Sequence, residues 1–199
     1  MTCMSHELVN VEEQCIYCGS SERITQDHVP PQCLFGDVPT SELIAVPGCL
    51  TCNNAFARDD EFLRDLIVTA TLHVDMPELA APLASPILQP VRALPVDSGR
   101  LQNVIQRIVR GLFFHETGRR IPADYFITVA DSRLLNGAPS YDKPYIAQVV
   151  SAALSGEERA IGGRRFGYCY RLLSDDPLGS VWLLSFLGQL VFLCTAGRR

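Results

Sequence analysis

An aspartate and a histidine stand side by side at positions 27 and 28, and Pro30 and Pro31 follow almost at once. A neutral imidazole can take a proton from water near pH 7. A carboxylate is a hard oxygen ligand suited to Mg²⁺, which retains most of its waters when it binds a protein. Asp27 and His28 could therefore activate water beside a bound divalent ion, provided that a second protein ligand is near.

The second ligand is expected at Asn53, directly after Cys52. Its amide supplies an oxygen donor, and its place beside a cysteine pair would hold that donor still. The neighbouring Asn54 is an alternative, but the position next to the cysteine favours Asn53. If the stretch around Asp27 begins as a strand, Asp27 and His28 face opposite sides, so that one binds the ion and the other faces the substrate.

Two CxxC pairs frame this chemistry: Cys15 with Cys18, and Cys49 with Cys52, separated by about thirty residues. Each CxxC turn directs two thiolates toward one tetrahedral ion, and two such turns complete a structural zinc site. The alternative, coincidental pairs of buried free thiols, fits two pairs within one short segment poorly. Zinc would also supply folding free energy on the order of 10 kcal/mol to a loop-rich, acidic segment.

The order CIYCG, DHVPP, CLTCNN resembles that of HNH endonucleases, the His-Me finger or ββα-metal group. It is similar to phage recombination endonucleases that combine a four-cysteine zinc with an Asp, a His and an Asn. The resemblance covers residues 12–72. It implies that His28 is the general base, that Asp27 and Asn53 bind a catalytic Mg²⁺ or Mn²⁺, and that the four cysteines hold a structural zinc.

Two positions depart from that family pattern. Ile44 stands where many members have an Asn that fixes the loop carrying the histidine, and a backbone contact or Glu42 could replace it. The lysine often found soon after the last Asn is absent, and Arg58 is the nearest basic residue. Both departures bear on catalytic efficiency more than on the fold.

The bulk composition bounds the class of protein. The chain has 199 residues, of which 47% are hydrophobic, and it shows no continuous apolar run long enough to span a membrane. Its first residues lack the pattern of a signal peptide, so a cytoplasmic protein without disulfides is expected. The net charge of −5 hides an acidic first half and a basic second half.

The elements predict an α+β fold in three parts: an HNH module with its zinc over residues 1–75, a Pro-rich connector over 76–97, and a helix with an antiparallel sheet over 98–199. One helix is expected from Asn53 and a second over residues 98–118, ended by Gly118. In the second helix one stripe is apolar, and Arg100, Arg107 and Arg110 are expected to point elsewhere. The stripe consists of Leu101, Val104, Ile105, Ile108 and Leu112. Strands are expected over four segments: 125–130, 145–154, 166–173, and 181–194, the last broken into a hairpin near Gly188.

Four arginines near the end of the second predicted helix are candidates for binding substrate phosphates: Arg107, Arg110, Arg119 and Arg120. The alternative is a solvated helix face with turn arginines. The stretch IVRGLFFHETGRRIP also resembles one in bacterial HNH proteins of uncharacterised role. That likeness implies a shared accessory region and no particular activity.

These observations together predict a metal-dependent endonuclease that hydrolyses DNA phosphodiester bonds, with phage defence or restriction as a fitting context. One rival is a zinc-stabilised module that binds nucleic acid or a protein without catalysis. Another is the nuclease subunit of a larger complex, docked through the C-terminal sheet.

Overall fold

A computed structural model describes residues 14–72, 97–131, 143–163, 165–188 and 190–198. The regular elements in chain order are β1 (Ile24–His28), η2 (Gln32–Leu34), η3 (Thr40–Glu42), β2 (Ala45–Cys49), α1 (Leu50–Leu72), α3 (Ser98–Thr117), β3 (Phe126–Asp131), α5 (Lys143–Leu154), β4 (Glu158–Ile161), β5 (Phe166–Leu172), β6 (Ser180–Phe186) and β7 (Leu190–Gly197). The strands form two antiparallel sheets, of order β1-β2 and β3-β7-β6-β5-β4. The predicted α+β class is confirmed.

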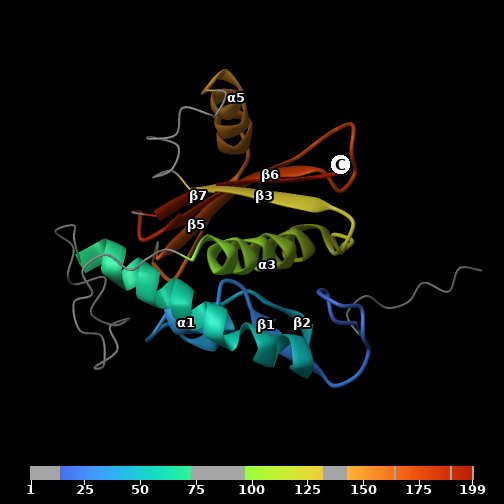
Figure 1. The fold of residues 1–199 in the computed structure, drawn as a ribbon, viewed down its shortest axis with the longest axis vertical. Helices are drawn as coiled ribbons and strands as arrows, with labels where there is room; N and C mark the ends of the chain where they lie inside the picture. Colours follow the sequence, from blue (N-terminus) through green and yellow to red (C-terminus); the bar gives the residue numbers. More distant parts are fainter. Residues whose placement is uncertain (1–13, 73–96, 132–142, 164, 189, 199) are drawn as a thin grey trace, which may run out of the picture.

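The elements stack in layers, with α3 in the middle (Figure 1). On one side of α3 lie α1 and the β1–β2 hairpin, and on the other side lies the five-stranded sheet. Helix α5 covers the opposite face of that sheet. Helix α3 therefore joins the part of the chain that carries the Asp-His pair to the part that was expected to be accessory.

The hairpin pairs β1 with β2 from Ile24 opposite Cys49 to His28 opposite Ala45. The predicted strand through the Asp-His pair is confirmed. The predicted start of the following helix at Asn53 was wrong, because α1 begins at Leu50, immediately after β2. Hairpin and helix are thus joined without a loop.

Helix α3 confirms the second predicted helix. The Asp97 carboxylate accepts from the backbone N–H groups of Gly99 and Arg100, which caps the N-terminus, and Gly118 ends the helix at φ 65°. Its apolar stripe is buried as expected: Leu101, Val104, Ile105, Ile108 and Leu112. The expectation that Arg107 points away from the core was wrong, because only 4% of Arg107 is exposed.

The sheet confirms the hairpin expected near Gly188, which β6 and β7 form. The strand predicted over 145–154 was wrong: this segment belongs to α5. Pro144 suits a first helical turn, where its missing N–H has no partner to lose. Val149 and Ala153, four residues apart, pack against Val181 and Leu193 on the sheet, so a short apolar run that fits either structure becomes a helix.

One hydrophobic core continues from the hairpin to the sheet. It contains Val29 next to the Asp-His pair, Leu63 of α1, Ile108 of α3 and Trp182 of β6. The expected connector over 76–97 lies outside the described residues except for Asp97. Of the helices in the described ranges, none has the length and apolar character needed to cross a membrane.

Candidate active site and metal centre

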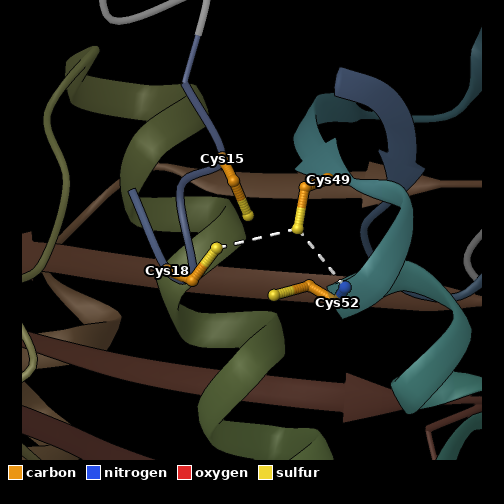
Figure 2. A group of neighbouring side chains, drawn as sticks. All are labelled: Cys15, Cys18, Cys49 and Cys52. Atoms are coloured by element: carbon orange, nitrogen blue, oxygen red, sulfur yellow. Dashed lines mark hydrogen bonds between the residues drawn. The ribbon is translucent and has the colours of Figure 1, made fainter. Parts of the chain in front are cut away.

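Four cysteines, two from the turn before β1 and two from the junction of β2 and α1, meet in one cluster (Figure 2). The sulfurs of Cys15, Cys18, Cys49 and Cys52 all lie within 4.8 Å of one another. The sulfurs of Cys18 and Cys49 are 3.6 Å apart. Four sulfurs bound at about 2.3 Å to a tetrahedral zinc would be roughly 3.8 Å apart, so the cluster could hold a metal ion such as zinc.

The side chain of Cys49 caps the N-terminus of α1, which is why the helix starts before Asn53. Its sulfur accepts a hydrogen bond of 3.4 Å from the backbone N–H of Cys52, in the way that an N-cap side chain accepts from the third helical residue. This hydrogen bond is the main cause that lowers the pKa of Cys49 to about 7. Burial and the neighbouring Cys49 thiol instead raise the pKa of Cys52, so a thiolate at Cys52 would be favoured by the charge of a bound divalent cation.

The predicted catalytic residues border a single pocket of about 430 Å³. Asp27 and His28 reach it from the end of β1, and Asn53 reaches it from the first turns of α1. Asn54 is exposed and does not line this pocket. Of the two asparagines considered from the sequence, Asn53 is therefore the one that lies beside the Asp-His pair.

Asp27 is buried, with 4% of its surface exposed, and its Oδ2 accepts a hydrogen bond of 2.6 Å from the phenol of Tyr17. Burial and the nearby Asp27 carboxylate raise the pKa of Tyr17 well above 10, so the phenol stays protonated and donates. Tyr17 lies between the first two cysteines. Its role was not predicted, although its position inside the CxxC turn was a signal that it would lie near the hairpin.

Asn53 is fixed through its amide nitrogen, which donates to the backbone oxygen of Gln26 at 3.4 Å and to Oγ1 of Thr25 at 3.5 Å. The amide oxygen has no hydrogen-bond donor among the described residues. Together with Asp27 it supplies the hard oxygen donors that Mg²⁺ or Mn²⁺ prefers.

His28 is half-buried, and no side-chain hydrogen bond holds its imidazole within the described part of the chain. The backbone after it is held instead: the N–H of Val29 donates to the carbonyl of Ile44 at 2.9 Å. Ile44 stands where the HNH pattern that the sequence resembles has an Asn. This backbone hydrogen bond at Ile44 holds the segment that directly follows His28.

Sequence reasoning missed Asp60, which lines the same pocket from two turns further along α1. Its carboxylate pairs with both terminal nitrogens of Arg107, and the guanidinium carbon lies 4.5 Å from the centre of the Phe56 ring. Burial outweighs the attraction of Arg107 and raises the pKa of Asp60 to about 6. The seven-residue spacing from Asn53, which places both on one helix face, was the available signal.

The other three candidate arginines also have intramolecular partners. Arg110 donates to the carbonyls of Ile121, Pro122 and Tyr125. Arg119 donates to the carbonyl of Pro177, and Arg120 donates to the carbonyl of Ile16 and the side chain of Gln14. These contacts tie α3 and the turn after it to the sheet and to the first cysteine turn. Phosphate binding by the four arginines stays a prediction.

No protein-family model, curated protein or solved structure matches the chain. Inferences about function therefore rest on the geometry of the cysteine cluster and of the neighbouring pocket.

Proposed function

We propose that this protein is a metal-dependent endonuclease that hydrolyses DNA phosphodiester bonds. The observation that carries the proposal is the shared pocket. Asp27, His28 and Asn53 are up to 26 residues apart in sequence, yet they border one cavity beside the four cysteines. The succession of β1, β2 and α1 supports an HNH-type module, since that is the order of elements the resemblance implies.

The residues divide into an acid-base group and two ion ligands. His28 takes a proton from a water molecule, which then attacks the phosphorus atom. Asp27 and Asn53 would hold Mg²⁺ or Mn²⁺ through one carboxylate oxygen and one amide oxygen. The ion, when bound, supplies positive charge that stabilises the phosphate oxygens and the leaving oxygen.

The zinc at the cysteine cluster has a separate role in the proposal. When bound, it would hold the first cysteine turn against the end of β2 and the start of α1. Since Asn53 follows Cys52 directly, fixing Cys52 also fixes the amide ligand. A zinc bound there would therefore preorganise the ligands without contacting the substrate.

The test is nicking of supercoiled plasmid DNA with Mg²⁺ or Mn²⁺, with Asn53→Ala compared against Asn54→Ala. The two residues are adjacent and chemically identical, but only Asn53 lines the pocket. Loss of a metal ligand should lower nicking at limiting metal by at least about tenfold. Asn54→Ala should nick at the wild-type rate.

Equal rates for wild type and both variants would contradict the assigned centre. DNA binding without nicking at every metal tested would favour the rival of a non-catalytic zinc-stabilised module. Cleavage of a labelled RNA alone would contradict the DNA part of the proposal and leave the catalytic centre intact.

A further inference from the structure

The first cysteine turn contacts one of the residues that line the pocket. Tyr17 stands between Cys15 and Cys18, and its phenol donates the 2.6 Å hydrogen bond to Oδ2 of Asp27. The two residues are ten positions apart and belong to different segments, the cysteine turn and β1. A residue of the cysteine cluster's own loop thus contacts the carboxylate proposed to bind the catalytic ion.

The hydrogen bond uses only one of the two carboxylate oxygens. Within the described ranges no other group donates to Asp27. Its Oδ1 has no hydrogen-bond partner among these residues and is not fully buried, so it keeps some exposed surface. Asp27 lines the pocket although only 4% of its surface is exposed, and Oδ1 is the carboxylate oxygen that has no hydrogen bond from a described residue. Holding Oδ2 therefore fixes the direction in which Oδ1 is presented.

The Tyr17 ring packs against Phe56 and lies close to Gly48. The Phe56 ring of α1 meets the Tyr17 ring edge-on, with centroids 5.0 Å apart and planes at 78°. Gly48 of β2 lies close to both partners of the hydrogen bond: an added Cβ would lie 3.2 Å from Cβ of Asp27 and 3.6 Å from the Tyr17 ring. A larger residue at position 48 would press on both partners of the hydrogen bond.

We propose that Tyr17 is a positioning residue that couples the four-cysteine site to the affinity of the catalytic divalent ion. This inference rests on the proposed function, because it takes Asp27 as an ion ligand. Hydrogen bonds that orient a metal ligand commonly change metal affinity by about 10–100-fold when they are removed. Loss of the phenol oxygen should therefore weaken ion binding while the general base and the rate at saturating metal change little.

The experiment measures Mn²⁺ binding to the zinc-loaded full-length chain by electron paramagnetic resonance. Four proteins are compared: wild type, Tyr17→Phe, Asp27→Ala and Tyr170→Phe. Tyr170 is the matched control, since its phenol also donates to a carboxylate, Glu116, at 2.9 Å, but in the distant sheet. Zinc content is measured on every sample, and the Mn²⁺ concentration for half-maximal plasmid nicking is measured in parallel.

We expect Tyr17→Phe to bind Mn²⁺ about tenfold more weakly than wild type and to retain one zinc. Tyr170→Phe should bind Mn²⁺ as tightly as wild type does. Wild-type affinity in Tyr17→Phe, with binding lost in Asp27→Ala, would overturn the inference and leave the proposed function standing. No Mn²⁺ binding in wild type, or unchanged binding in Asp27→Ala, would overturn both.

A second variant covers the case in which Tyr17→Phe loses its zinc. Phe56→Leu removes the ring that meets Tyr17 edge-on, and it leaves all four cysteines and the phenol in the chain. It should weaken Mn²⁺ binding in the same direction and by less than Asp27→Ala does. Wild-type affinity in Phe56→Leu would then overturn the inference.

Discussion

Gly111 of α3 faces Val29, the residue that follows His28, at a separation that leaves no space for a side chain. A Cβ added at Gly111 would lie 2.5 Å from Cγ2 of Val29. Only 1% of Val29 is exposed, so it has little room to move away. A helix from the second half of the chain thus sets the position of the segment that carries His28.

Gly111→Ala should therefore displace that segment. Overpacking of this kind costs about 1–3 kcal/mol, and displacement of His28 should lower the rate of DNA nicking. Gly99→Ala, in the first turn of the same helix, is the control, because its added Cβ would meet only Oδ1 of Asp97 at 3.4 Å. It should be neutral or stabilising. Urea unfolding and nicking rates check both variants, and equal effects would contradict the packing argument.

Arg107→Met should cost far more stability than Arg100→Met, although both arginines of α3 pair with an aspartate of α1. Arg107 pairs with Asp60 in a buried setting, whereas Arg100 pairs with Asp59 at 2.9 Å with 38% of its side chain exposed. Leaving a buried partner uncompensated costs about 3–5 kcal/mol, whereas an exposed pair contributes about 1 kcal/mol or less. The free energy of unfolding in urea is the measurement. Similar losses for the two variants would contradict the assigned burial.

Titration of Asp60 should make the stability of the protein depend on pH. Burial raises its pKa to about 6 from a usual 3.8, so the folded chain holds this proton more tightly than the unfolded chain. Stability relative to Asp60→Asn should therefore fall as the pH rises from about 4 to about 6, by on the order of 3 kcal/mol. Urea unfolding of both proteins across this range tests the sign. A difference that grows with pH would show that the ion pair outweighs burial.

Purified protein should contain one zinc, and Cys49→Ser should lose it. Since Cys49 caps α1 and would also bind the metal, we expect Tm to fall by roughly 10 °C. Cys169→Ser is the control, because Cys169 lies in β5 away from the cluster and should keep zinc and Tm. Elemental analysis and thermal unfolding decide. A full zinc complement in Cys49→Ser would contradict the site.

The features that were predictable from the sequence are those with a local pattern. The two CxxC pairs predicted the cysteine cluster, and the apolar stripe and Gly118 predicted α3. The start of α1 was not predictable from ordinary capping residues, because a cysteine sulfur caps it. The segment over 145–154 was too short and too evenly apolar for its period to separate strand from helix.

The support of the candidate site was not predictable because it depends on contacts between distant residues. Asp60 and Arg107 are 47 positions apart, and Val29 and Gly111, which are in contact, are 82 positions apart. Such pairs depend on how α3 packs against the first part of the chain, and a local sequence pattern does not predict that packing. The chemistry-bearing residues were thus predictable as types, whereas their partners required the fold.

The most direct test of the proposed centre is the rate of plasmid nicking by His28→Ala at saturating Mn²⁺, relative to wild type. His115→Ala near the end of α3 serves as the control, since His115 does not line the pocket. Removal of a general base should slow nicking by about 10²–10⁴-fold, with zinc content and Mn²⁺ binding unchanged. A His28→Ala protein that nicks DNA as fast as wild type would contradict the account.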